Sequence, residues 1–229
     1  MDTVVELLEL PHPDEAPALE SGRRSYEYAR FRATAYKTAN YLRYNGVGDH
    51  ATVAIVPERT PETAFGVLGA ALLGGTVEMD PPDEVDATVL IGPTDDLDAY
   101  ETTPGCKRIG YGNPPEDPSW AYFEREVWSE NPFFPQVDVD GATPLLDGVT
   151  QGSALTRARE IGADLRPADD VAVRESLANP DAIVAGLLAP LVVGATVLFP
   201  SEGQTGSVAV GADGPEERTV PATPTGVED

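Results

Sequence analysis

Apolar residues in the first part of the chain alternate between helical and extended spacing. A helix is predicted to begin at Ser25, which is a suitable N-cap residue, and to end at the left-handed stop Asn45-Gly46. Its buried face has the spacing i, i+4, i+8 and i+11: Phe31, Ala35, Ala39 and Leu42. The β-rich run 52–56, closed by Pro57, then predicts a buried strand.

A second helix has a clear beginning. Thr60 can cap it, Pro61 suits the first helical position, and Glu62 favours the positive end of the helix dipole. Its apolar run reaches Gly74-Gly75, and residues 76–79, 87–91 and 107–111 then predict three strands. This order of elements favours a doubly wound, mostly parallel α/β sheet with helices on both faces.

The second half continues the alternation. Trp120, Phe123 and Val127 form a helical stripe, which we interpret as core packing, and Thr150 caps a helix that runs to Ile161. Strands are predicted at 171–173 and 195–199, on either side of a helix at 180–193. We expect the C-terminal strands to build a second, smaller sheet.

Three regions follow from these patterns. Residues 1–20 read as a loose N-terminal arm, 21–200 as the α/β domain, and 201–229 as a hairpin followed by a disordered tail. The hairpin would pair 207–211 with 218–220 across Asp213-Gly214.

The charge balance is extreme. The formal net charge is −24, with 39 acidic and 15 basic residues, and Lys37 and Lys107 are the lysines. Acids spread along the whole chain favour a halophile protein whose carboxylates keep its surface hydrated in concentrated salt. An acidic protein that binds a basic partner is the alternative. A nucleic-acid partner is disfavoured, because no basic patch is evident.

Few residues suggest catalysis. Cys106 is the single cysteine and reads as a packing residue, and His12 and His50 both lie in the first quarter of the chain. These spacings predict no metal site. The uncharged segment 182–199 reads as a buried helix that turns into a strand rather than a membrane span, and we find no leader sequence. We therefore expect a cytoplasmic protein with no membrane partner.

An ordered series of short motifs runs along the chain in two groups. The first group is Ser25-Tyr26 opening a helix, Gly46-Val47-Gly48-Asp49, Val53-Ala54-Ile55-Val56-Pro57, Pro61-Glu62, Leu68-Gly69-Ala70, Gly75-Thr76-Val77 and Asp80-Pro81. The second is Thr150 to Leu155, Leu165-Arg166-Pro167-Ala168-Asp169, Gly186-Leu187-Leu188-Ala189-Pro190-Leu191 and Gly194-Ala195-Thr196-Val197. This series is similar to the N-terminal region of acyl-CoA synthetases, in the adenylate-forming (AMP-binding) family, and the resemblance covers most of residues 21–200.

One part of the family pattern is missing. The resemblance implies a loop rich in Ser, Thr and Gly, ending in Pro-Lys-Gly, that binds the ATP phosphates. Residues 143–150 instead read TPLLDGVT, and no lysine follows Lys107. The resemblance also implies a histidine that gates the acyl pocket, but no histidine stands near 176–186. The given sequence does not reach the family's later nucleotide motifs or its C-terminal domain. We expect a tight turn at Asp147-Gly148, with the negative charge of Asp147 where phosphates would lie.

The resemblance and the gap together predict a truncated, degenerate and non-catalytic relative, a pseudoenzyme that acts through a protein partner such as a full-length synthetase. Two alternatives stay open: a module that binds an acyl or nucleotide small molecule, and one half of a split AMP-forming synthetase. We assign no catalytic, cofactor-binding or metal residue and no cofactor.

Several other residues could belong to a functional site. Glycines that could admit a ligand read more simply as helix stops: Gly74, Gly75 and Gly194. Adjacent carboxylates read as solvated side chains: Asp95 with Asp96, and Asp169 with Asp170. Two aromatic residues near a Gly/Pro loop suggest no mechanism: Tyr111 and Trp120.

Overall fold

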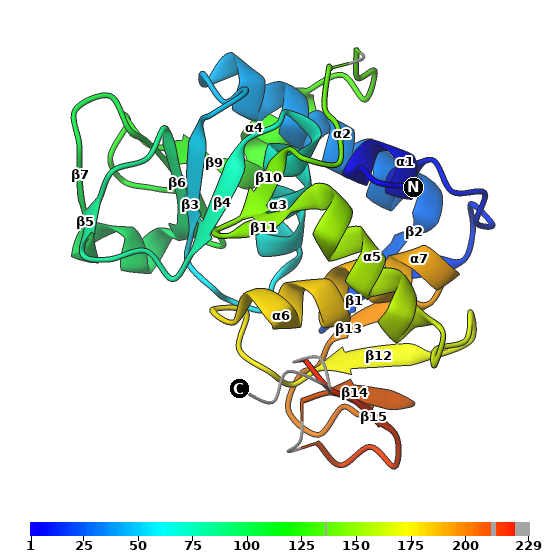
Figure 1. Cartoon of the computed structure of the whole chain (residues 1–229). Helices are drawn as coiled ribbons and strands as arrows, with labels where there is room; N and C mark the ends of the chain where they lie inside the picture. Colours follow the sequence, from blue (N-terminus) through cyan, green and yellow to red (C-terminus); the bar gives the residue numbers. More distant parts are fainter. Residues whose placement is uncertain (136, 212–213, 223–229) are drawn as a thin grey trace, which may run out of the picture. The chain divides into compact units, whose positions relative to one another are not determined.

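The computed structural model describes residues 1–135, 137–211 and 214–222. The chain divides into two compact units, labelled by element in Figure 1. Unit 1 is Met1–Phe31, Arg59–Pro61 and Gly152–Asp229, and unit 2 is Arg32–Glu58 and Glu62–Gln151. Each unit is built on one main sheet with helices, so the predicted α/β class is confirmed.

Unit 2 contains a seven-stranded sheet. Its strands, in order across the sheet, are β11 (Val149–Thr150), β10 (Pro144–Leu146), β4 (Thr76–Met79), β3 (Thr52–Ile55), β6 (Val89–Pro93), β8 (Lys107–Tyr111) and β9 (Ala121–Tyr122). All neighbours pair in parallel except β10 and β11. A separate pair is formed by β5 (Glu84–Val85) and β7 (Glu101–Thr102). The mostly parallel sheet was predicted from the order of elements.

Helix α3 (Pro61–Leu72) packs between this sheet and helix α2 (Tyr28–Tyr44). A Cβ at Gly66 would lie 3.0 Å from Ile55 Cδ1, on the sheet side. A Cβ at Gly69 would lie 2.9 Å from Thr38 Cγ2, on the α2 side. The predicted buried face of α2 is confirmed, because its four apolar residues are fully buried: Phe31, Ala35, Ala39 and Leu42.

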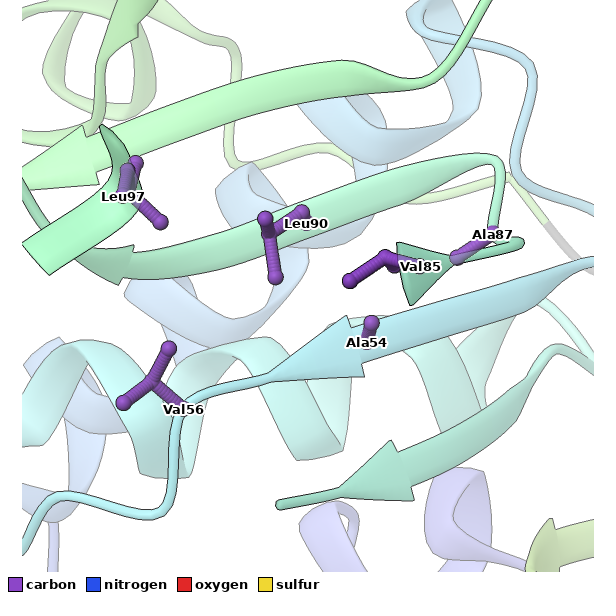
Figure 2. Close-up of a cluster of buried hydrophobic side chains, with 6 residues drawn as sticks. All are labelled: Ala54, Val56, Val85, Ala87, Leu90 and Leu97. Atoms are coloured by element: carbon purple, nitrogen blue, oxygen red, sulfur yellow. The ribbon is translucent and has the colours of Figure 1, made fainter. Parts of the chain in front are cut away.

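The opposite face of the sheet carries its own apolar cluster, drawn in Figure 2: Ala54, Val56, Val85, Ala87, Leu90 and Leu97. Ala54 of β3 and Leu90 of β6 are register partners. Val85 of β5 and Leu97 of the 3-10 helix η1 (Thr94–Ala99) cover them. The short elements between β4 and β8 therefore serve as the second layer on this face.

Unit 1 contains a six-stranded sheet. Its order is β15 (Thr219–Val220), β14 (Val208–Val210), β12 (Asp170–Val173), β13 (Thr196–Phe199), β1 (Pro17–Ser21) and β2 (Arg24–Glu27). The prediction of a smaller sheet made from C-terminal strands was incomplete, because β1 pairs in parallel with β13 and brings β2 with it. A local pattern cannot reveal a partner strand so distant in sequence.

Two predictions at the start of the chain were wrong. Residues 1–20 are not a loose arm, because they hold β1 and helix α1 (Val4–Leu8), which Thr3 and Glu6 cap reciprocally. Ser25 does not cap a helix, because it pairs with Glu20 in the β1–β2 ladder, and α2 begins at Tyr28. Strand pairing outweighs the local capping signal here.

The helices between β11 and β13 lie near their predicted positions. They are α5 (Gln151–Gly162), α6 (Pro180–Ile183), the π-helical turn η2 (Val184–Leu188) and α7 (Ala189–Val193). The last three form one continuous helical segment, as predicted for 180–193. No helix in the described ranges has both the length and the apolar character needed for a membrane span.

The predicted C-terminal hairpin is wrong in direction. Strands β14 and β15 do pair, but in parallel. Two residues just before β15 form ion pairs. Arg174 Nη2 donates to Glu216 Oε1 at 2.6 Å, and Arg218 Nη1 donates to Asp169 Oδ1 at 2.7 Å. These ion pairs hold the segment that enters β15. Asp213 of the predicted Asp213-Gly214 turn lies outside the described residues. The predicted disordered tail lies, from residue 223 on, outside the described residues.

The C-terminal end of α7 is held by two residues from the N-terminal region. Tyr28 Oη donates to the Ala195 carbonyl at 2.8 Å, and His12 Nε2 lies 2.8 Å from the Leu191 carbonyl oxygen. The two rings are 4.8 Å apart. Burial raises the pKa of Tyr28. Its hydroxyl is therefore a neutral donor that satisfies a buried carbonyl.

Replacing Tyr28 by Phe should destabilise the protein by about 1–3 kcal/mol, because the Ala195 carbonyl would lose its side-chain donor in a buried setting. Chemical denaturation followed by circular dichroism measures this change. Tyr44→Phe is the matched control, since Tyr44 is 85% exposed. Equal stability of the two variants would contradict the structural role of the Tyr28 hydroxyl.

The C-terminal ion pairs predict an acid-sensitive structure. Burial acts to raise the pKa of Asp169, but hydrogen bonds from Arg218, the Arg166 amide and Ser207 outweigh it and lower the pKa. Burial also acts to raise the pKa of Glu216, but hydrogen bonds from Arg174 and from the Gly206 amide outweigh it and lower that pKa. A carboxyl group whose pKa is lower in the folded than in the unfolded state stabilises the fold at pH values above its unfolded-state pKa. This stabilisation is lost as the pH falls through its folded-state pKa.

The free energy of unfolding should therefore fall as pH drops below about 4, the ordinary carboxyl range. Arg218→Gln should lose about 1–3 kcal/mol at neutral pH and show a weaker dependence on acid. Denaturant titrations at a series of pH values test both points. Arg166→Gln is the control, because its backbone amide rather than its side chain contacts Asp169. An unchanged acid profile in Arg218→Gln would refute the assignment.

Candidate functional site

The carboxyl ends of the parallel strands in unit 2 meet at one edge of the seven-stranded sheet. Open α/β sheets bind their ligands at this kind of edge. We call it the carboxyl edge, and define it by the residues that follow the strands: Asp147-Gly148 after β10, Asp80 after β4, Val56-Pro57 around the end of β3, Thr94-Asp95 after β6, and Gly112-Asn113 after β8.

At one side of this edge, the chain turns back immediately. Leu146 of β10 pairs with Val149 of β11, so Asp147 and Gly148 alone connect the two strands. Gly148 has φ +68, a left-handed conformation that glycine adopts without strain. Both turn residues are exposed. The tight turn predicted at Asp147-Gly148 is confirmed.

The residue that opens α5 belongs to the core rather than to a ligand site. Gln151 is fully buried, and its Nε2 donates to the carbonyl of Ala71 in α3 at 2.8 Å. Its backbone amide donates to the Thr143 carbonyl at 2.9 Å. These two bonds fix the end of the β10–β11 turn against α3.

At the β6–β8 side, the edge residues bond to one another. Thr94 Oγ1 lies 2.7 Å from the Asn113 carbonyl oxygen and 3.2 Å from that of Tyr111. Asn113 Nδ2 donates to Asp95 Oδ2 at 2.9 Å. Gly112 donates its amide to Glu124 Oε1 at 2.8 Å. The polar groups of these edge residues are thus engaged in local hydrogen bonds.

The exposed side chains of the edge that carry charge are acidic: Asp80, Asp95 and Asp147. None of the residues that define the edge is a lysine or an arginine. Within the described ranges, no group of three or more His, Cys, Asp or Glu is arranged to hold a metal ion. Among the residues that define the edge, the formal charge is therefore negative.

Cys106 and His50 precede β8 and β3, at the amino ends of these strands rather than at this edge. Cys106 is half-buried against the Figure 2 cluster with Tyr100 and Trp120, and burial raises the pKa of its thiol. His50 is exposed beside Asp49, at 3.2 Å, and His12 belongs to unit 1. The interpretation of Cys106 as a packing residue agrees with these contacts.

The two carboxylate pairs lie in different units and differ in setting. Asp95 and Asp96 are exposed in η1, as predicted. Asp170 is exposed, whereas Asp169 is buried and ion-paired, so its interpretation as a solvated side chain was wrong. Arg218 is the residue whose charge could have indicated a buried ion pair for Asp169, but it lies 49 residues further along the chain and only the fold brings the two together.

The candidate glycines end helices. Gly74 follows α3 with φ +78, and Gly194 is the left-handed cap of α7. Gly75 amide donates to the Ala70 carbonyl at 3.0 Å, a bond that closes the end of α3. Their simpler interpretation as helix stops is confirmed.

A scan against models of known protein families finds no match for this chain. Among curated proteins, it is 41% identical over 70 residues to tyrocidine synthase 3 of Brevibacillus parabrevis, covering 30% of this chain and 1% of that protein. It is 28% identical over 153 residues to 3-hydroxybenzoate–CoA ligase of Aromatoleum, covering 65% of this chain and 27% of the ligase.

Solved structures extend the similarity to most of the chain. An anthranilate CoA ligase with bound anthranoyl-AMP superposes with a TM-score of 0.73 at 17% identity, covering 87% of this chain and 45% of the ligase. A benzoate CoA ligase from Burkholderia xenovorans gives 0.72 at 18% identity, covering 92% and 50%. The chain thus has the fold of the N-terminal region of acyl-CoA synthetases, and it spans at most half the length of these two enzymes.

The tightness of the carboxyl edge can be tested at Gly110. A Cβ there would overlap Thr94 Oγ1 and lie 3.1 Å from Thr94 Cβ. Gly110→Ala should therefore destabilise the protein by about 1–3 kcal/mol through overpacking. Gly48→Ala is the control, because no atom lies within 4 Å of its added Cβ. Urea titrations that show the same stability for both variants would contradict the close packing of Thr94.

Proposed function

We propose that this chain is a synthetase-like protein that does not adenylate a carboxylate by itself and acts through a protein partner. The observation that carries the proposal is the two-residue turn between β10 and β11. In the synthetases that the sequence resembles, this point of the chain holds the Ser/Thr/Gly loop that binds ATP phosphates. We interpret Asp147-Gly148 as standing in place of that loop.

The physical argument concerns the charge on the triphosphate. Adenylation requires donors and cations that are already positioned around the phosphates, and loss of one such donor costs roughly a hundred- to a thousandfold in rate. The turn offers two backbone amides and the carboxylate of Asp147. Such a turn cannot supply the set of donors that a phosphate loop provides.

A protein partner is the natural route to a function without this chemistry. The fold and its apolar cores are complete without the loop, so the chain can still present surfaces. A full-length synthetase of the kind that the chain resembles is one such partner. We further propose that it works in the cytoplasm of a salt-accumulating cell, where its charge of −24 favours solubility.

ATP–pyrophosphate exchange tests the first part of the proposal. In molar KCl with Mg-ATP, we expect no exchange above background with anthranilate, benzoate, 3-hydroxybenzoate or amino acids. The three aromatic acids match the CoA ligases to which the chain is similar. An active full-length CoA ligase, assayed in the same buffer at a salt level it tolerates, is the positive control. Acid-dependent exchange by this chain alone would overturn the proposal.

Thermal unfolding with the same compounds, AMP and coenzyme A separates the alternatives. A ligand that binds only the folded protein raises its stability by about 2.7 kcal/mol at a hundred times its Kd. We expect no shift with Mg-ATP. A shift with AMP or an acid alone would favour a binding module, and exchange activity that appears only after adding a second chain would favour a split enzyme.

A further inference from the structure

The short elements that cover the Figure 2 cluster are strongly acidic. We call residues 83–87 and 94–102, which contain β5, η1 and β7, the acidic cover. It carries seven carboxylates, and all of them are exposed: Asp83, Glu84, Asp86, Asp95, Asp96, Asp98 and Glu101. No lysine or arginine occurs in the sequence from Thr60 to Cys106. Like charge is therefore concentrated on one layer of unit 2.

A few apolar contacts attach this cover to the main sheet. Strands β5 and β7 pair with each other in a sheet of their own, and a two-stranded sheet is marginally stable by itself. Val85 and Leu97 are buried against Ala54 and Leu90 of the seven-stranded sheet, as Figure 2 shows. A Cβ at Gly92 of β6 would lie 2.9 Å from Leu97 Cδ2, so Leu97 approaches the strand closely. Burial of these side chains is what favours the closed position of the cover.

The negative charge of the cover is not neutralised locally. Among the residues that the structure describes, none of its carboxylates forms an ion pair, and the side chains that donate to them, Thr103 and Asn113, are neutral. The nearest cations in the following sequence are Lys107 and Arg108, at the start of β8. Arg108 already donates to the Tyr100 carbonyl. Even with both cations counted, the seven carboxylates leave an excess of negative charge.

The fold brings these carboxylates close to one another. Glu84 and Glu101 are register partners in the β5–β7 pair, and like charges opposite each other destabilise a sheet. Burial raises the pKa of Tyr100, and three neighbouring carboxylates raise it further: Asp80, Asp96 and Asp83. Charges act on each other over about 10 Å at 0.1 M salt but over only about 3 Å at 1 M. Repulsion within the cover is therefore strong in dilute salt and largely screened in molar salt.

We propose that the acidic cover is a salt-dependent element of the fold. In concentrated salt it is closed on the apolar cluster, and at low ionic strength it opens while the seven-stranded sheet stays folded. The contacts of Val85 and Leu97 favour the closed state, and repulsion between the carboxylates favours the open state. The sheet itself is held from its other face, where α3 packs closely on β3. Local opening of this kind needs less free energy than global unfolding.

Cys106 provides a direct reporter, because it is the single cysteine of the chain and is half-buried against the cluster. The probe is N-ethylmaleimide, an uncharged thiol reagent. We expect labelling to be at least about tenfold faster in about 0.05 M KCl than in about 2 M KCl, with an unchanged far-UV circular dichroism spectrum. Burial raises the pKa of this thiol, whereas Arg108 lowers it and Asp86 raises it. Rates are therefore measured across pH, so that exposure of the thiol is separated from a change in its pKa.

Trp120 gives a second readout, because it also packs against the cluster. The chain has two tryptophans, and Trp128→Phe leaves Trp120 as the one fluorophore of this type. Its emission should shift to the red at low salt, as the ring becomes exposed to water.

Two double variants localise the repulsion. Glu84→Gln with Glu101→Gln removes the opposed charges of the β5–β7 pair, and should reduce the salt dependence of Cys106 labelling by about threefold. Glu160→Gln with Glu217→Gln is the matched control, because both residues are exposed in unit 1 and the net charge changes by the same amount. This control should keep the salt dependence of the parent chain.

Three outcomes would overturn the inference. The first is a labelling rate that does not rise at low salt. The second is a rise that accompanies loss of the circular dichroism signal, because the whole protein would then unfold rather than the cover open. The third is an equal effect of the two double variants, because the repulsion would then come from the net charge of the chain rather than from the acidic cover.

Discussion

Close packing on both sides of α3 is the constraint on which unit 2 depends. Every residue of this helix is buried, and its glycines let it approach β3 and β6 on one side and α2 on the other. Gly66 and Gly69 leave no room for a Cβ without displacement of Ile55 or Thr38. Because protein interiors tolerate little change in volume, this contact fixes α2 relative to the sheet.

The carboxyl edge has the geometry of a ligand-binding α/β sheet, and its residues are held by local contacts. Asp95 and Asn113 hydrogen-bond to each other, Thr94 is packed against Gly110, and Asp147 stands at the tip of a two-residue turn. Asp80, Asp95 and Asp147 give the edge a negative charge. The proposal that this chain does not adenylate a carboxylate by itself rests on this turn and this charge.

Helix α2 serves two purposes in unit 2. Its apolar face, with Ala39 and Leu42, packs toward α3, and the face with Lys37, Asn40 and Tyr44 holds the segment from Trp128 to Phe133. One helix thereby links the packing of α3 to the position of this segment.

The sequence by itself determined the elements whose signal is local. The apolar periods of α2 and α3, the strands 52–55, 76–79 and 107–111, and the Asp147-Gly148 turn all follow from neighbouring residues. Tertiary structure alone decided the rest. Strand β1 pairs with β13 far along the chain, β15 runs parallel to β14, and the ion pairs of Glu216 with Arg174 and of Arg218 with Asp169 join residues distant in sequence. The exposure of Tyr44, Trp128 and Phe133 was also decided by the fold, because exposure depends on which neighbours cover a ring, and no local pattern records that.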